Sequence, residues 1–122
     1  MWIFSTVGFF SIVRKAHPKA PGRPIQIRAR SLDDLEALAK YCRLAGAEAE
    51  VIVTHDADYA GRLAVKAETL GAIMATLPNA IDYPNFKGAM AELPRQRDKL
   101  RALHEVWEVM HDYQVAKHGK SG

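Results

Sequence analysis

Alternating apolar and polar positions predict two β-strands in the first quarter of the chain. In the run FFSIVR at 9–14, Phe10 and Ile12 fall on one face and Ser11 falls on the other. In IQIRAR at 25–30, the isoleucines fall on one face, and the glutamine and both arginines fall on the other. The segment between the two runs holds three prolines and a glycine, which is typical of a loop. We therefore expect the two runs to pair as an antiparallel hairpin.

An earlier apolar run, WIFST at 2–6, is separated from this hairpin by Gly8. The glycine fits a tight turn between two strands or a bulge within one long strand, and the pattern leaves both open. Farther on, AEVIVT at 49–54 and the alternating stretch 59–66 predict two more strands, joined by a turn at 55–58.

Three stretches carry the spacing of amphipathic helices. The first follows Ser31, which has the place of an N-cap with an acid three residues later, and it ends near Gly46. The second runs over about 67–77, and the third runs from Arg95 to about Ala116.

The order of these elements predicts an α+β fold. Antiparallel hairpins alternate with helices, which favours a two-layer sandwich: a sheet of about four strands with helices on one face. The expected form is ferredoxin-like or a permuted variant, with a helical C-terminal extension. We expect a single domain over 1–122, with the sandwich core at 1–80, the extension at 81–118 and a frayed tail at 119–122.

Composition fits one domain with its own core. The chain has 122 residues, of which 48% are hydrophobic, and a single cysteine, Cys42, so no internal disulfide can form. A reducing, cytoplasmic setting is the simplest expectation. The apolar start carries its basic residues after the apolar run, which is the reverse of a signal peptide. The run is also too short to span a bilayer, so no membrane partner is expected.

Charge is placed unevenly along the chain. The first 30 residues carry six basic and no acidic side chains, whereas the whole chain has a net charge of +3. This asymmetry favours an anionic partner, or else the basic end neutralises the acidic remainder within the fold or across a dimer.

The strand alternation gathers basic residues on one sheet face. If the helices cover the apolar face, the other face presents arginines from two strands, and the loop cations extend that surface. Such a surface suits a phosphate backbone, and Phe9 or Phe10 would add base stacking. The candidate nucleic-acid-binding residues are Arg14, Lys15, Lys19, Arg23, Arg28, Arg30, Arg62 and Lys66. Alternatively, acids of the third helix cover and neutralise this face; they are Asp98, Glu105, Glu108 and Asp112.

Two motifs resemble a group of short bacterial and phage-encoded proteins. Members open on Met-Trp-aliphatic-Phe, continue to Gly-Phe-Phe-Ser, and carry Asp-Tyr-x-Asn-Phe-Lys after the second helix. The matching positions are Trp2, Phe4, Gly8, Phe9, Phe10, Ser11, Asp82, Tyr83, Asn85, Phe86 and Lys87. The resemblance covers residues 1 to about 110 and implies a fold expectation without an activity. Val7 and the proline-rich loop at 16–24 depart from the group's pattern.

The segment DYPNFK has two interpretations. Its polar residues form a small recognition cluster, or they serve an ordinary helix start in which the two aromatics fill the core and Asp82 or Asn85 provides the cap. Pro84 favours the first turn of that helix, with Asp82 or Tyr83 as its cap.

Catalytic and metal-binding signals are weak. The HDADY segment offers His55, Asp56 and Asp58 as ligands, but an Asp-rich turn explains it as well. His104, His111 and His118 recur every seven residues, about 10 Å apart along a helix, which is too far for one ion. That spacing better suits a helix–helix seam.

No cofactor, metal or catalytic residue is therefore expected. The leading hypothesis is a small binding protein, phage- or mobile-element-like, that engages nucleic acid or a nucleoprotein through its basic N-terminal hairpin. The alternative is a protein–protein module or homodimer, and an enzyme of unknown reaction is third.

Overall fold

The computed structural model describes residues 1–16, 22–54 and 58–119, and it divides into two compact units, Met1–Asp82 and Tyr83–Gly122. Across the described residues the fold is α+β: a five-stranded antiparallel sheet with helices packed against it, and a long C-terminal helix. The expected α+β class is confirmed at this level. The ferredoxin-like order, or a permuted form of it, stays a prediction.

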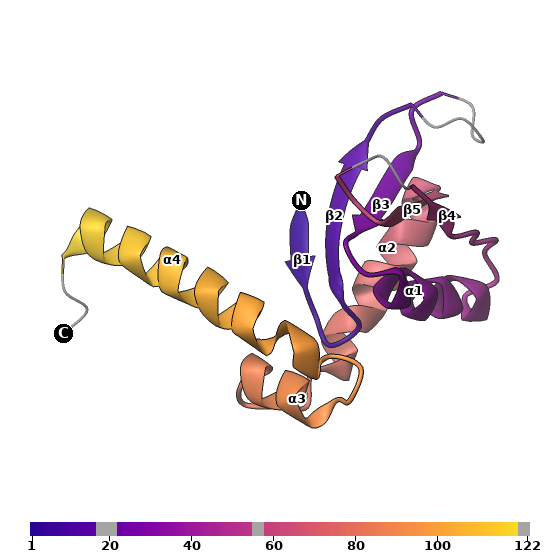
Figure 1. The fold of residues 1–122 in the computed structure, drawn as a ribbon. Coiled ribbons are helices and arrows are strands. Elements are labelled where there is room, and N and C mark those ends of the chain that lie inside the picture. Colours follow the sequence, from indigo (N-terminus) through magenta and orange to yellow (C-terminus); the bar gives the residue numbers. More distant parts are fainter. Residues whose placement is uncertain (17–21, 55–57, 120–122) are drawn as a thin grey trace. The chain divides into compact units, whose positions relative to one another are not determined.

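The sheet of the first unit has the strand order β1-β2-β3-β5-β4, and every neighbouring pair is antiparallel (Figure 1). Among the described residues it has five strands where about four were expected. The strands are β1 (Trp2–Phe4), β2 (Phe9–Arg14), β3 (Ile25–Ala29), β4 (Ile52–Val53) and β5 (Gly61–Val65).

The additional strand arises because Gly8 closes a tight turn. The amide of Ser5 donates to the carbonyl of Gly8 at 2.9 Å, and the amide of Gly8 donates back to the carbonyl of Ser5 at 3.1 Å. This reciprocal pair settles the choice between a turn and a bulge. It folds β1 back onto β2, and Trp2 then lies opposite Ser11.

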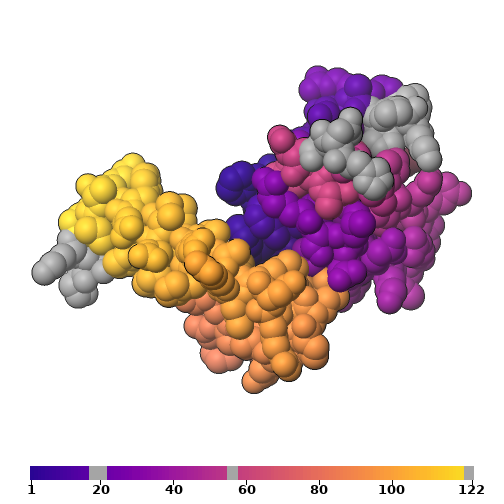
Figure 2. All heavy atoms as spheres, viewed as in Figure 1, coloured from indigo at the N-terminus to yellow at the C-terminus, as the bar shows by residue number. Residues whose placement is uncertain are grey.

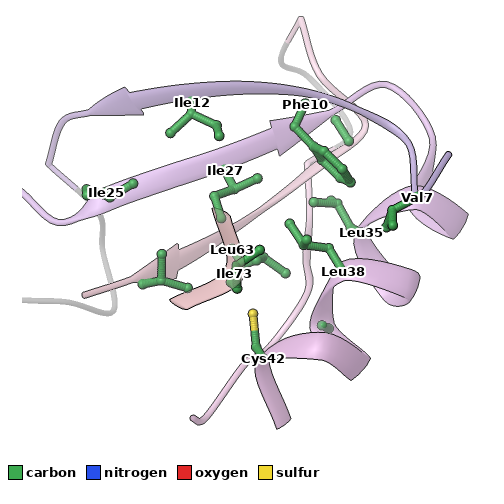
Figure 3. Packing of buried hydrophobic residues seen from close by; sticks show 13 residues of the cluster. Val7, Phe10, Ile12, Ile25, Ile27, Leu35, Leu38, Cys42, Leu63 and Ile73 are labelled. Carbon is green, nitrogen blue, oxygen red and sulfur yellow. The ribbon is translucent and has the colours of Figure 1, made fainter. Parts of the chain in front are cut away.

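Both helices of the first unit pack on one face of the sheet. Helices α1 (Leu32–Leu44) and α2 (Ala67–Thr76) contribute Leu35, Leu38 and Ile73 to the same buried cluster as the inward side chains of β2, β3 and β5 (Figure 3). The predicted alternation appears in the burial of β5, whereas in β2 and β3 Ser11 and Gln26, on the face away from the helices, are buried as well. A short 3-10 helix, η1 (Leu77–Ala80), follows α2.

The ends of α1 follow the predicted signals only in part. Gly46, just beyond the helix, has φ +82°, which is the left-handed conformation that a C-terminal glycine accommodates. Ser31 occupies the N-cap position but makes no side-chain cap hydrogen bond. The predicted capping pair is wrong because the carboxylate of Asp34 is buried against the β1–β2 turn, where it accepts from the amide of Phe9 at 3.2 Å.

The fourth strand is also shorter than predicted. The structure has β4 over Ile52–Val53 only, where 49–54 was expected, because its hydrogen-bonded register with β5 covers just those two residues. The predicted turn at 55–58 lies outside the described residues except for Asp58.

The second unit consists of α3 (Phe86–Glu92), a 3-10 turn η2 (Arg97–Lys99) and α4 (Leu100–His118). The cap of α3 is Asn85, whose Oδ1 accepts from the amide of Gly88 at 2.8 Å. The alternative that named Asn85 is confirmed, and the expectation of Asp82 or Tyr83 is wrong. Pro84 precedes this cap, so its predicted place in the first turn is wrong as well. The α-helix expected from Arg95 begins at Leu100, because the preceding residues form turns. None of the helices in the described part of the chain is long and apolar enough to cross a membrane.

Candidate nucleic-acid interface

The sheet of the first unit has a second face, which carries the side chains that point away from the hydrophobic cluster of α1 and α2. We call it the arginine face, and it consists of Trp2, Phe4, Phe9, Ser11, Val13, Gln26, Arg28, Ile52, Arg62 and Ala64. None of these positions is acidic. The arginine face therefore combines positive charge with apolar and aromatic side chains.

Strand register aligns five of these residues in a straight line across the sheet. Trp2 pairs with Ser11, Ser11 with Arg28, Arg28 with Arg62, and Arg62 with Ile52. We call this line the cross-strand row. Neighbouring strands lie about 4.8 Å apart, so each member of the row is within reach of the next.

Arg28 and Arg62 are the central feature of the row. They face each other across β3 and β5, both half-buried, and among the described residues neither guanidinium pairs with a carboxylate. The Nε atoms of both arginines are buried and have no hydrogen-bond partner in the described part of the chain. Two like charges directly opposite each other destabilise a sheet, and an unpaired buried donor adds to that cost. An anion on the Nη side of the pair would offset the repulsion between the two charges.

Two buried polar side chains hold these guanidinium groups in place. Arg28 donates from Nη2 to the hydroxyl of Ser11 at 2.8 Å, and Arg62 donates from Nη1 to Oε1 of Gln26 at 3.0 Å. The amide nitrogen of Gln26 in turn donates to the carbonyl of Ala16 at 2.6 Å. Each arginine is thus fixed by one hydrogen bond, which leaves most of its five donors for other partners.

Tyr59 contacts Arg28 and a further arginine, Arg30. Its buried ring lies under Arg28 and Arg30, with guanidinium carbons 4.6 Å and 4.4 Å from the ring centroid. Arg30 also donates to the carbonyl of Asp58 at 2.7 Å. These cation–π contacts restrict the arginines without neutralising them, so the positive charge of the face is retained.

Three aromatic side chains gather at the β1–β2 edge of the arginine face. The ring centroid of Phe9 lies 4.3 Å from that of Phe4 and 5.9 Å from that of Trp2. We call this group the aromatic cluster. Trp2 is 69% exposed although its ring contacts that of Phe9. Phe10 is a different case: it is buried in the core on the opposite face, so the prediction that it can stack on a base is wrong.

The remaining predicted basic residues lie beyond the row. Arg14, Lys15, Arg23 and Lys66 are exposed, and Lys19 lies outside the described residues. Arg14 and Arg23 each donate to the other's backbone carbonyl, at 3.2 Å and 3.3 Å, which closes the β2–β3 loop.

A shallow cleft lies next to this loop and mixes both signs of charge. Its charged lining residues are Arg14, Arg23, Arg43, Glu48, Glu50 and Lys66. The cleft is therefore less selective for an anion than the arginine face, which carries no acid.

The DYPNFK residues belong mostly to the start of α3. Asn85 caps the helix, and the rings of Tyr83 and Phe86 lie 6.2 Å apart. Lys87 places its ammonium 5.1 Å from the ring centroid of Trp107 on α4, and Asp82 is exposed. These contacts give four of the five residues local structural roles.

Titratable groups of the described residues do not converge elsewhere on a metal site. No group of three or more His, Cys, Asp or Glu side chains in the described ranges can hold a metal ion, and His55 and Asp56 lie outside those ranges. His104 and His111 stack on either side of Trp107, at 6.0 Å and 5.0 Å. Burial raises the pKa of the Cys42 thiol, which makes it a poor nucleophile.

Comparison of the chain with protein-family models, curated proteins and solved structures finds no match.

Sequence reasoning missed two members of the site. Trp2 could have been found from the alternation in Trp2-Ile3-Phe4, provided that Gly8 had been assigned to a turn. Tyr59 carries no such signal, because it precedes β5 and reaches the arginines only through the folded sheet.

Proposed function

We propose that this protein is a small, non-enzymatic binding protein of the cytoplasm that engages nucleic acid, alone or within a nucleoprotein, through the arginine face. The observation that carries the proposal is the Arg28–Arg62 pair, which is half-buried and lacks a carboxylate partner among the described residues. Arginine pairs bind phosphate groups with several parallel hydrogen bonds, and a basic surface adds salt-dependent attraction.

The exposed cations around the row extend this surface. Arg30 stands next to it on the Tyr59 ring, and Arg14, Lys15 and Arg23 belong to the neighbouring loop. In this proposal they contact further phosphates and guide the polymer toward the Arg28–Arg62 pair.

Titration with labelled oligonucleotides tests the proposal. The full chain is mixed with single-stranded DNA, single-stranded RNA and duplex DNA at low and near-physiological salt. We expect binding that weakens with salt and that an Arg28→Gln/Arg62→Gln variant weakens by about tenfold or more.

A Lys40→Gln/Arg101→Gln variant is the matched control. Like the Arg28→Gln/Arg62→Gln variant, it removes two positive charges. Lys40 is exposed on α1, at the other side of the sheet, and Arg101 is exposed on α4. It should bind as the unsubstituted chain does. Equal weakening by both variants, or no binding at low salt, overturns the proposal.

A second candidate function, homodimer formation, is favoured by the surface of α4. Figure 2 shows the atoms of this helix, orange to yellow, at the molecular surface, and several large apolar side chains are exposed. They are Val106, Trp107, Val109, Met110 and Tyr113. Sedimentation equilibrium should then show a dimer that a Trp107→Asp/Met110→Asp variant converts to a monomer. A chain that stays monomeric at all concentrations removes this candidate.

A further inference from the structure

We infer that the cross-strand row holds an unpaired nucleotide, with its base against Trp2 and a neighbouring phosphate on the guanidinium groups of Arg28 and Arg62. This inference rests on the proposed function and specifies the ligand that its central site takes: a single strand with accessible bases.

The first observation is the exposure of Trp2. An indole that is 69% exposed on an edge strand contributes little to the core, yet Phe9 holds it at the end of the arginine face. Bases stack on aromatic rings presented in this way by sheets. Trp2 therefore has the placement of a stacking platform.

The second observation is the spacing along the row. Trp2 and Arg28 are separated by one strand, so their backbones lie about 10 Å apart. The residue between them is Ser11, a small side chain that is itself buried. One small residue of the row therefore separates the indole from the guanidinium group of Arg28.

The third observation is the geometry of the cation pair. Arg28 and Arg62 are each fixed by one hydrogen bond, to Ser11 and Gln26, and both keep donors for a phosphate. A phosphodiester carries one negative charge on two oxygens, and two facing guanidinium groups can share it. Preorganised arginines lose less side-chain entropy when they bind.

Duplex nucleic acid satisfies only half of this site. Its phosphates can reach the arginines, but its bases are stacked inside the helix and present no free ring face to Trp2. A single strand engages both halves, so the site should prefer it over a duplex of the same length.

Fluorescence of Trp2 tests the inference directly. A Trp107→Phe variant keeps Trp2 as its single tryptophan. This variant is titrated with three probes of about ten nucleotides: oligothymidylate, an abasic strand with the same phosphates, and a duplex. We expect oligothymidylate to quench Trp2 emission and to bind more tightly than either of the other probes.

Substitution of Trp2 then separates stacking from charge. Trp2→Ala should weaken oligothymidylate binding by about five- to 150-fold and leave abasic binding unchanged, while Trp2→Phe should retain most of the affinity. A thermal melt of each variant verifies folding, and the quenching experiment does not depend on changing Trp2.

The outcomes distinguish this inference from the proposed function. Equal binding of the abasic strand and oligothymidylate, with Trp2 emission unchanged, overturns the inference, and the proposed function still stands if Arg28→Gln/Arg62→Gln weakens both probes. If no probe binds at low salt, the inference and the proposed function are both wrong.

Discussion

At the scale of single residues, the close approach of Gly8 to Asp34 leaves no room for a side chain at position 8. A Cβ at position 8 would lie 2.4 Å from Cγ of Asp34, a carboxylate that is 1% exposed and hydrogen-bonded to the amide of Phe9. The carboxylate cannot move into solvent without losing that bond. Glycine is required here because of space, and the tight turn that creates β1 depends on it.

Gly8→Ala should therefore lower the free energy of unfolding by about 1–3 kcal/mol, the usual cost of overpacking. Urea denaturation measures this difference. Gly71→Ala is the control, since Gly71 is exposed in the middle of α2 and has no atom within 4 Å of a new Cβ. That substitution should raise stability by about 0.4–1 kcal/mol. Equal effects of the two substitutions would contradict the steric argument.

Cys42 gives the chain a pH dependence at alkaline pH. The thiol is buried in the core beneath the sheet, and burial raises its pKa above the ordinary value. In the unfolded chain the thiol ionises near pH 8.5, while in the folded chain it stays neutral to a higher pH. Between these two pKa values the unfolded state loses a proton that the folded state keeps, so stability falls as pH rises.

We expect the stability advantage of the unsubstituted chain over Cys42→Ala to shrink as pH rises from 7 toward 10, with a slope of at most about 1.4 kcal/mol per pH unit. The cavity that alanine leaves lowers the free energy of unfolding by the same amount at every pH. It therefore does not affect the slope of the free energy of unfolding against pH. Urea denaturation at a series of pH values gives both curves. A difference that does not change with pH would show that the thiol titrates alike in both states.

At the scale of elements, the starts of α1 and α3 both carry a residue that can cap a helix, but only one of them is capped by its side chain. Asn85 accepts from the amide of Gly88, which has no acceptor within its own helix, whereas Ser31 makes no side-chain cap bond. The carboxylate of Asp34, three residues after Ser31, accepts from the amide of Phe9 in the β1–β2 turn.

Asn85→Ala should therefore expose the amide of Gly88. With a typical cap contribution of about 1 kcal/mol, its hydrogen-exchange protection should fall by about fivefold. Ser31→Ala should leave the protection of the first turn of α1 nearly unchanged. Exchange monitored by NMR on both variants makes the comparison, and an equal loss at both helices would mean that Ser31 is a cap in solution.

Predictability from sequence also differs between elements. The alternation in β2, β3 and β5 identifies which side chains share a face, because side chains alternate with a period of two whatever the partner strand. It does not identify which residues stand opposite each other. That register depends on the Gly8 turn and on the long-range pairing of β3 with β5. Arg28 and Arg62 could therefore be placed on one face but not opposite each other, and Trp2 could not be placed at all until the turn was known.

At the scale of the whole molecule, net charge is a poor guide to the proposed interface. The excess of six cations in the first 30 residues includes exposed loop residues as well as Arg28, which is half-buried on the sheet. Arg62, its partner in the row, comes from a segment outside that excess. The site is a product of folding, because two separated parts of the chain each supply one guanidinium group.

The salt dependence of binding measures how many phosphates Arg28 and Arg62 contact. For a single strand, each phosphate neutralised by a cation contributes about 0.7 to the slope of log K against log salt. Replacing Arg62 with Gln should lower the magnitude of the slope by about 0.7, and replacing both Arg28 and Arg62 should lower it by about 1.4. The Lys40→Gln/Arg101→Gln control should keep the original slope, although it has lost the same net charge.

Affinities measured for oligothymidylate at four or more salt concentrations give these slopes. If the affinity falls in the Arg62→Gln variant while the slope stays the same, Arg62 does not touch a phosphate, and its contribution is to the geometry of the sheet.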